Sequence, residues 1–181
     1  DVTENYDVTL IPGSLTITAA QIAVSVTANS DSRVYTGSEQ TVTGYGAPVG
    51  LLSGHVLSGI SASGSGTNVG SYPVTFTGTP VIMDGLVDVT ENYDVTLIPG
   101  SLTITPATGD EFNVTGYTGV YDGLEHGVSV IGQMTGDLIE YSLDGEIWST
   151  TSPMFINVST TTVYVRATNP NYTDRNDSAL V

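Results

Sequence analysis

The chain of 181 residues contains no cysteine and no lysine, and its only strongly basic side chains are Arg33, Arg166 and Arg175. Without cysteine it can form neither a disulfide nor a thiolate metal site, and it has no thiol nucleophile. Without lysine, an isopeptide cross-link between lysine and asparagine side chains is impossible. Its purely apolar stretches are only a few residues long, so we expect no membrane insertion.

Positive charge is nearly absent. Acidic residues number 19 against three arginines, which gives a formal net charge of −16. Such a charge repels phosphate groups, so we expect no nucleic-acid partner and no attraction to anionic lipid. The acidic residues are spread along the sequence, which is typical of a solubilising surface rather than of a local binding patch.

Composition that favours helix is also missing. Glycine occurs 21 times, and no long segment is rich in Ala, Leu, Glu, Lys and Arg. Apolar residues instead alternate with polar ones in short runs, as at 22–26, 72–76 and 161–167, which indicates strands with one buried face. Pro73 cannot donate a ladder hydrogen bond, so its strand is predicted at a sheet edge. The predicted fold class is all-β.

The clearest feature that is present is an internal repeat. Residues 1–18 and 88–105 both read DVTENYDVTLIPGSLTIT, at an offset of 88 − 1 = 87 residues. This identity indicates duplication of a unit whose length is ordinary for a β-sandwich domain. In the later copy two alternating runs flank Pro99-Gly100, a pair that suits the centre of a type II turn. The pattern predicts a hairpin or another tight strand connection.

Shorter matches at a similar offset support the duplication: Val34-Tyr35-Thr36-Gly37 with Val120-Tyr121-Asp122-Gly123, and Asn68-Val69 with Asn157-Val158. We therefore predict three parts, namely residues 1–18 as the C-terminal hairpin of a preceding repeat, 19–106 as a complete β repeat, and 107–181 as a second β repeat truncated in its last strand. An unpaired sheet edge accepts strands from other molecules. The first hairpin could therefore dock on a neighbouring molecule.

Several phrases of the sequence recur in the same order in both repeats or are familiar in themselves: VYTG and VYDG at 34–37 and 120–123, NYDVT at 92–96, GSLTITPA at 100–107, YSLDG at 141–145 and VYVRATNPNY at 163–172. Together they resemble the MBG/YDG-type repeats of large bacterial adhesins, over essentially the whole chain. The resemblance implies an extracellular location on a bacterial cell surface, in tandem arrays between a secretion signal and a cell-wall anchor. It implies neighbouring repeats as partners and supplies no catalytic residues.

Two architectures fit the predicted strands. Tandem immunoglobulin-like β-sandwich modules agree with the repeat length and the strand count. A β-grasp-type module is the alternative, and it needs a helix that crosses the sheet. Residues 47–61 are the only stretch of the first repeat long enough for that helix, and their glycines disfavour it.

The two repeats differ at two aromatic positions. Tyr72 can form a tyrosine corner, in which its hydroxyl bonds back to the main chain, whereas Thr161 occupies the matching place in the second repeat. Trp148 occurs only in the second repeat, and a single tryptophan in a small β module is expected in the core.

Catalysis has little support in the sequence. The only histidines, His55 and His126, lie at non-equivalent positions and are interpreted as surface residues, and no serine has the setting of a hydrolase nucleophile. We expect neither an enzyme nor a cofactor.

Calcium is the one metal considered, because it takes oxygen ligands from acidic loops. The candidate ligands are Asn171, Asp174, Asn176 and Asp177, followed by Asp110 with Glu111. Their spacing matches no EF-hand loop, and Asn and Asp are also common in solvated turns, which is the competing interpretation.

Two functions remain as predictions. The first is a stalk or spacer in adhesion, in which each repeat adds length. The alternative is a ligand-binding module that contacts host glycan or protein, which requires an exposed aromatic side chain; Tyr164, at an outward position of its strand, is the candidate.

Overall fold

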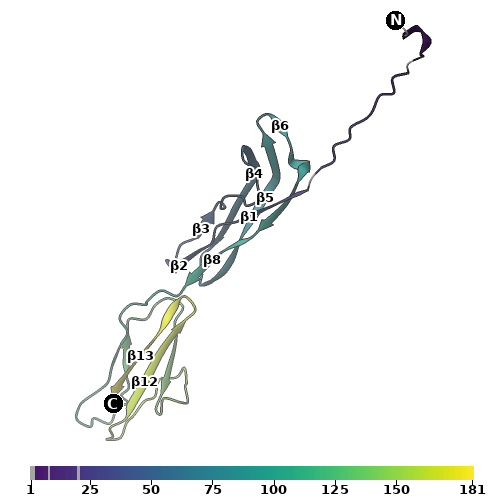
Figure 1. Cartoon of the computed structure of the whole chain (residues 1–181). Coiled ribbons are helices and arrows are strands. Elements are labelled where there is room, and N and C mark those ends of the chain that lie inside the picture. The colour runs from purple at the N-terminus through teal and green to yellow at the C-terminus, as the bar shows by residue number, and fades with distance from the viewer. Residues whose placement is uncertain (1–2, 8, 20) are drawn as a thin grey trace.

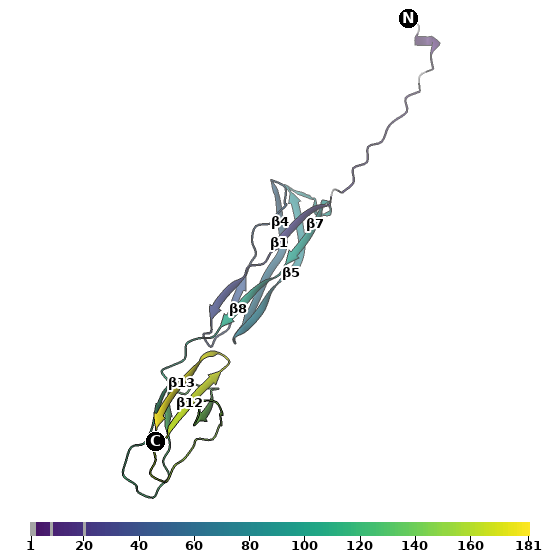
Figure 2. The same cartoon turned by 60° about the horizontal axis from the view of Figure 1, so that its bottom comes forward.

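The computed structural model describes residues 3–7, 9–19 and 21–181. Two groups of strands lie end to end, and the N-terminal residues project from one end (Figure 1). The same linear order is visible from a second direction (Figure 2). We call residues 19–106 unit 1, residues 107–181 unit 2, and the described part of residues 1–18 the arm.

Strands make up both units, and the described residues form helix only in two short 3-10 turns, η1 (Thr3–Asn5) and η2 (Thr90–Asn92). The strands of unit 1 are β1 (Ile22–Thr27), β2 (Asp31–Val34), β3 (Gln40–Thr43), β4 (His55–Gly66), β5 (Gly70–Asp84), β6 (Val87–Asp88), β7 (Tyr93–Ile98) and β8 (Gly100–Thr105). Those of unit 2 are β9 (Asn113–Thr115), β10 (Ser129–Ile131), β11 (Leu138–Ser142), β12 (Thr162–Asn169) and β13 (Tyr172–Leu180). The all-β class is confirmed. Neither described helix is long enough to cross a bilayer.

The first two strands of unit 1 run parallel to its last two. β1 pairs with β7 and β2 pairs with β8, and the registers Ile22↔Tyr93 and Asp31↔Leu102 share an offset of 71 residues (93 − 22 and 102 − 31). Between these two ladders, the segment from β1 to β2 and the segment from β7 to β8 each pass from one sheet to the other. The second sheet is the one that contains β5, which pairs with β8. Pro99 therefore connects β7 to β8 across a change of sheet, so of the two predicted alternatives, a hairpin or another tight strand connection, the second is observed.

Gly100 is needed for a different reason from the one predicted. Its φ is not in the positive region that a type II turn requires. A Cβ at Gly100 would collide with the backbone carbonyl oxygens of Ala28 and Asn29, at the point where the neighbouring strand also changes sheets. Glycine here permits the close approach of two backbones.

The long strands β4 and β5 form the backbone of unit 1. β5 pairs with β4 over Thr75–Asp84 and with β8 over Gly70–Val74, so the prediction that the strand of Pro73 is at an edge is wrong. The β4–β5 ladder ends at Thr75, two residues from Pro73, which explains how a strand with two neighbours accepts a proline. A register shift beside Gly59, whose φ is +80°, bends the pair.

The core of unit 1 lies between its two sheets. One cluster joins β1 and β7 to β5 through Val24, Val26, Ile82 and Tyr93, and the other is centred on Val74, Leu102 and Ile104. Tyr45 and Phe76 pack against both clusters, with ring centroids 5.7 Å apart. The predicted pin is confirmed: the Tyr72 hydroxyl donates to the Asn68 carbonyl oxygen at 2.9 Å.

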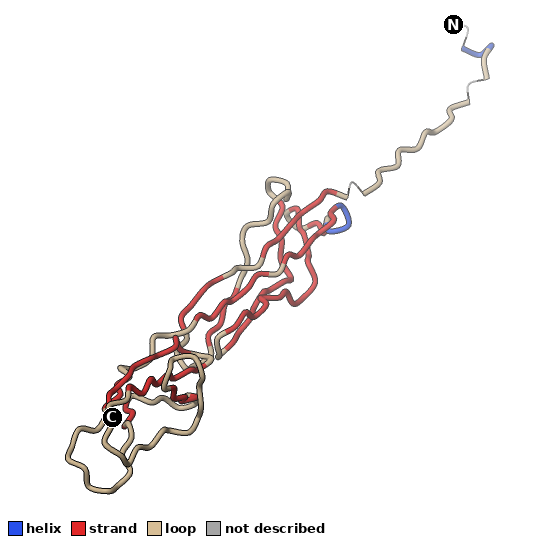
Figure 3. Tube along the Cα trace, turned by 90° about the horizontal axis from the view of Figure 1, so that it is seen from below, coloured by secondary structure: helices blue, strands red, loops and turns tan. Residues whose placement is uncertain are grey.

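Unit 2 has a three-stranded sheet, β11-β12-β13, and a separate β9–β10 pair, joined by long loops (Figure 3). Its core is smaller, with Val114, Val163 and Val165 buried. A parallel bridge between Ala107 and Tyr172 resembles the Ile22↔Tyr93 pairing that begins the β1–β7 ladder.

No described residue supplies the helix of a β-grasp module. In residues 47–61, the only stretch of the first repeat long enough for that helix, Val49 forms a bridge with Ser25 and β4 begins at His55. The glycines of this stretch are compatible with a loop and a bent strand, which agrees with their low helix propensity.

The two units meet through a small set of specific contacts. The Val69 N–H donates to the Asn171 Oδ1 at 2.9 Å, and the Asn171 Nδ2 donates to the Asn68 Oδ1 at 3.3 Å. The rings of Tyr35 and Tyr172 meet edge to face, 5.4 Å apart, a geometry worth about 0.5–1.5 kcal/mol beyond the area that it buries. We call this contact set the joint.

The arm has no such partners. Its apolar side chains Leu10, Ile11, Leu15 and Ile17 are between 86% and 88% exposed, and Tyr6 is 72% exposed. The assignment of residues 1–18 to a preceding repeat therefore stays a prediction.

Candidate interaction surface

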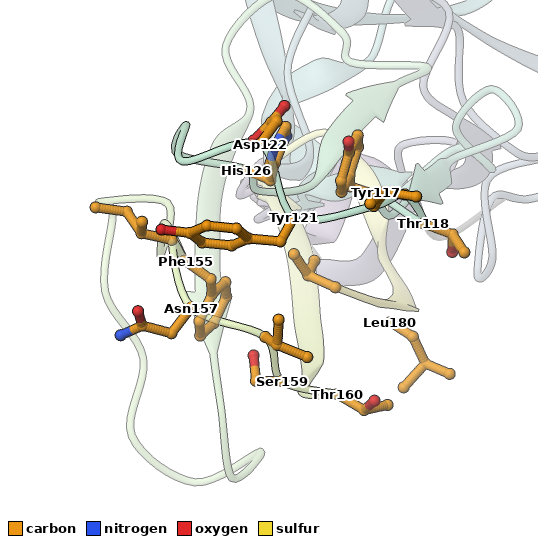
Figure 4. Close-up of a pocket in the computed structure, with 15 residues that line it drawn as sticks. Tyr117, Thr118, Tyr121, Asp122, His126, Phe155, Asn157, Ser159, Thr160 and Leu180 are labelled. Carbon is orange, nitrogen blue, oxygen red and sulfur yellow. Dashed lines mark hydrogen bonds and ion pairs between the residues drawn. The ribbon is translucent and has the colours of Figure 1, made fainter.

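A cavity of about 330 Å³ opens at the end of unit 2 that lies away from the joint. Its wall is formed by residues from three segments, Tyr117–Asp122 with His126, Phe155–Thr160, and Leu180–Val181 (Figure 4). Several of the apolar side chains on this wall are exposed, among them Val120 and Val158, at 88% and 87%. The described part of the chain thus leaves an apolar, partly enclosed hollow open to solvent.

His126 is held rigidly in this wall. Its Nε2 lies 3.0 Å from the Asp122 Oδ1, and its ring stacks on Tyr117 with centroids 3.5 Å apart. The Leu124 N–H and then His126 hydrogen-bond to Asp122 and hold the pKa of that carboxyl below its usual value. The His126 side chain is 23% exposed, so its interpretation as an ordinary surface residue is wrong.

His55 in unit 1 is also more enclosed than predicted. Its Nδ1 lies 2.7 Å from the Tyr93 hydroxyl, its Nε2 lies 3.7 Å from the Asp84 carboxylate, and the side chain is 16% exposed. It links β4 to β7, which makes it a structural tie at the end of unit 1 from which the arm emerges.

Neither histidine has the arrangement of a nucleophilic catalytic site. Within the described ranges, no serine or threonine hydroxyl is hydrogen-bonded to His126, whose Nε2 is already bonded to Asp122. A Ser-His-Asp system requires the imidazole to bond the nucleophile on one nitrogen and the carboxylate on the other. The cavity therefore offers exposed apolar side chains beside polar ones, and the hydrogen-bonded Asp122–His126 pair is its charged element.

The predicted calcium ligands do not converge. Asp174, Asn176 and Asp177 lie along β13, where successive side chains point to opposite faces. The side chain of Asn171 is bonded in the joint, and Asp177 accepts the Val114 N–H at 2.7 Å. Among residues 3–7, 9–19 and 21–181 no group of three or more His, Cys, Asp or Glu could hold a metal ion.

Trp148 is not a core residue. It is half-buried and lies under the guanidinium of Arg166, 4.3 Å from the ring centroid, while Arg166 donates to Glu140 at 2.8 Å. The core prediction is wrong because the indole packs on the Arg166 side chain of β12, a cation–π contact, and not among the buried apolar residues of unit 2. Tyr164 lies on β12 at the same parity as Arg166 and is 40% exposed, as its outward position predicted.

A buried ion pair, which no sequence pattern indicates, holds unit 2 together. Arg175 on β13 donates from one terminal nitrogen to both oxygens of Asp137 at 2.6 Å, and their side chains are 8% and 2% exposed. Burial alone would raise the pKa of Asp137, but the Met134 N–H, the Asn169 amide and Arg175 together lower it. All three arginines of the chain are thus paired with acids, the others being Arg33 with Asp31 and Arg166 with Glu140.

A second hollow, of about 320 Å³, lies beside the loop after β11. Its polar element is a turn in which the Asp144 carboxylate accepts the N–H groups of Ile147 and Glu146 and the Ser142 hydroxyl, which lower the pKa of Asp144. These bonds are all local and satisfy the turn itself.

Comparisons with protein-family models, with curated proteins and with solved structures give no match. The function is therefore inferred from the geometry of the chain itself.

Proposed function

We propose that this chain is a non-catalytic extracellular segment of a bacterial surface protein, in which β units stacked end to end act as a stalk or spacer in adhesion. The joint carries the proposal. A flexible linker would leave the two units free, whereas here the Asn171 amide accepts one hydrogen bond and donates another across the joint, and the rings of Tyr35 and Tyr172 meet edge to face.

Three further observations agree with a stalk. The exact repeat indicates serial duplication, and near-identical copies are tolerated in a protein whose repeats serve to extend its length. The high negative charge keeps such a chain soluble. The parallel pairing of the first and last strands of unit 1 and the core between its two sheets suit an immunoglobulin-like sandwich, whose termini lie at opposite ends. The MBG/YDG resemblance supplies the cell-surface setting.

The absence of cysteine allows a direct test of rigidity. Leu86 in unit 1 and Ile147 in unit 2 are 97% and 77% exposed, so Leu86→Cys and Ile147→Cys give the only two sites for spin labels. We expect a single narrow distribution of distances between the labels. Asn171→Ala together with Tyr172→Ala should broaden it, while Tyr164→Ala, outside the joint, should not. A broad distribution in the otherwise unchanged chain would reject the stalk.

A ligand-binding module is the second candidate, favoured by the exposed ring of Tyr164 near the Arg166–Trp148 pair. An aromatic face beside a cation suits stacking on a sugar ring. Binding on a glycan array that is lost in Tyr164→Ala would support this role, and an array without signal would leave the stalk as the single proposal.

A further inference from the structure

The residues that unit 1 contributes to the joint have exposed counterparts in unit 2. On the unit 1 side the joint is formed by Tyr35 and Asn68-Val69; by the sequence matches, Tyr121 and Asn157-Val158 take their places in unit 2. The correspondence extends to the backbone, since Gly37 and Gly123, two residues after the tyrosines, have φ values of +78° and +76°.

These two matching sets of residues differ in their contacts and in their exposure. Tyr35 and Val69 are half-buried: they pack on the core of unit 1 and contact Tyr172 and Asn171 of unit 2. Tyr121 and Val158 are 62% and 87% exposed and line the cavity at the far end of unit 2 (Figure 4). A surface that is bonded to an Asn-Tyr pair in one unit is thus open in the other.

We propose that this cavity binds the Asn5-Tyr6 pair of the arm of a second copy of the chain, in a head-to-tail contact that repeats the chemistry of the joint. In that contact the Val158 N–H donates to the amide oxygen of Asn5, the amide nitrogen of Asn5 donates to Asn157, and the Tyr6 ring packs on Tyr121. Because the arm and the cavity are different surfaces, each copy keeps one of them free, and further copies can add head to tail.

The exposure of the tyrosines selects the arm as the occupant. The chain holds one other Asn-Tyr pair outside the joint, Asn92-Tyr93, but Tyr93 is 6% exposed and its hydroxyl is bonded to His55. Tyr6 is 72% exposed, and η1 before it repeats the local turn η2 that precedes Tyr93. The arm therefore presents the same dipeptide in the same local structure with its ring free.

The apolar residues that come next in the arm fit the rest of the cavity wall. Leu10 and Ile11 are 87% and 88% exposed, and the wall offers Val120 and Val158 with similar exposure. Burial of such pairs gives about 25 cal/mol per Å² of apolar surface, so a contact of this kind is favourable although small.

The arm cannot reach the cavity of its own chain. It leaves unit 1 at the end opposite the joint, and the cavity lies beyond unit 2 (Figure 1). At ~3.5 Å per residue the stretch from Tyr6 to Ile22 spans about 55 Å, whereas β5 alone is about 50 Å long and β13 adds about 30 Å. The occupant must come from a second copy.

Sedimentation velocity on the whole chain tests the contact. An interface smaller than those of stable complexes predicts association between about 10 μM and about 1 mM. Tyr6→Ala and Tyr121→Ala should each weaken self-association at least about tenfold, an effect of about 1.4 kcal/mol, whereas the control Tyr164→Ala should not. A 1:1 mixture of the two weakened variants should recover a heterodimer that does not grow further, because one supplies an intact cavity and the other an intact arm.

Recovery in the mixture also shows that each variant is folded. A chain that stays monomeric up to about 1 mM, or association that survives Tyr121→Ala, overturns the proposal. Loss in Tyr121→Ala without loss in Tyr6→Ala overturns the arm as the occupant. The rigidity of the joint, measured with spin labels, does not depend on any of these results, so the stalk and the contact between copies fail separately.

Discussion

The last strand of unit 1 and the last strand of unit 2 are stabilised by different interactions. The arm carries the sequence of β8 and shows how that sequence behaves without neighbouring strands. In unit 1, Leu102 and Ile104 of β8 are buried, at 0% and 1% exposure. Leu15 and Ile17, the same positions of the identical sequence in the arm, are 87% and 86% exposed. In unit 2 the last strand, β13, places Arg175 in the interior against Asp137.

The comparison shows how far the structure of one sequence depends on the strands around it. One sequence includes the strands β7 and β8 in unit 1, whereas residues 9–18 of the arm are exposed and form no strand, because a strand needs neighbours for its hydrogen bonds and its apolar face. Unit 2, with its smaller core, relies on a charge pair that costs desolvation and is stable only while both partners are present.

The largest effect is expected when the charge pair of unit 2 is broken. Asp137→Ala leaves Arg175 buried without its partner, and we expect unit 2 to lose about 3–5 kcal/mol of unfolding free energy. Trp148, the only tryptophan, lies in unit 2, so its fluorescence during urea unfolding reports that unit alone. The control Asp31→Ala removes an exposed ion pair with Arg33 and should change stability by less than about 1 kcal/mol. Equal effects of the two substitutions would contradict the assignment.

A comparable loss is expected from the core of unit 1. Leu102→Ala should cost about 3–5 kcal/mol through lost burial and the cavity that it leaves, measured as faster amide exchange across β2, β5 and β8. Leu15→Ala makes the same change in the same sequence context and should leave the exchange of unit 1 unaltered. A similar loss in both variants would mean that the arm packs on a unit.

Acid should distinguish the units by a smaller amount. The folded-state pKa of Asp137 is lowered, so its contribution is present at a pH above the pKa of an unfolded aspartate and is lost as the pH falls through the folded-state value. Below about pH 4 the Trp148 transition of unit 2 should therefore move to lower urea concentrations, by less than Asp137→Ala causes at neutral pH. An equal shift in the Asp137→Ala variant would assign the acid sensitivity to another group.

The smallest effect is expected at the tyrosine pin. Tyr72→Phe removes the hydrogen bond to the Asn68 carbonyl and should cost unit 1 about 1 kcal/mol. Because Asn68 also contacts Asn171, the same change should loosen the joint slightly, seen as NMR shift changes at Tyr172. Thr161→Val, at the matching place in unit 2, serves as the comparison and should affect neither.

Local patterns in the sequence were reliable where the cause was local. Period-two alternation identified the strands, Tyr72 was recognised as a pin, and the VYTG and VYDG phrases do mark equivalent turns with glycine at positive φ. Pro99-Gly100 left a hairpin and another tight connection open, because a proline-glycine pair is found both at a hairpin and at a change of sheet. Its role is fixed by Ala28 and Asn29, about 70 residues away.

The cavity and the charge pair were out of reach for the same reason. Asp137 and Arg175 are 38 residues apart, and nothing in the alternation of β13 marks an arginine as inward-facing. His126 could be recognised only as one of two histidines at non-equivalent positions; its stacking on Tyr117 depends on a loop whose course no periodicity specifies. The sequence matches did, however, align Tyr121 with Tyr35, and the proposed role of the cavity rests on that correspondence.

Residual dipolar couplings of the backbone amides in a weakly aligned sample test the central claim, that the two units form one rigid body, most directly. The account predicts that couplings from unit 1 and unit 2 fit a single alignment tensor, and that they separate into two tensors in the Asn171→Ala, Tyr172→Ala double variant. Two distinct tensors in the unaltered chain would contradict it.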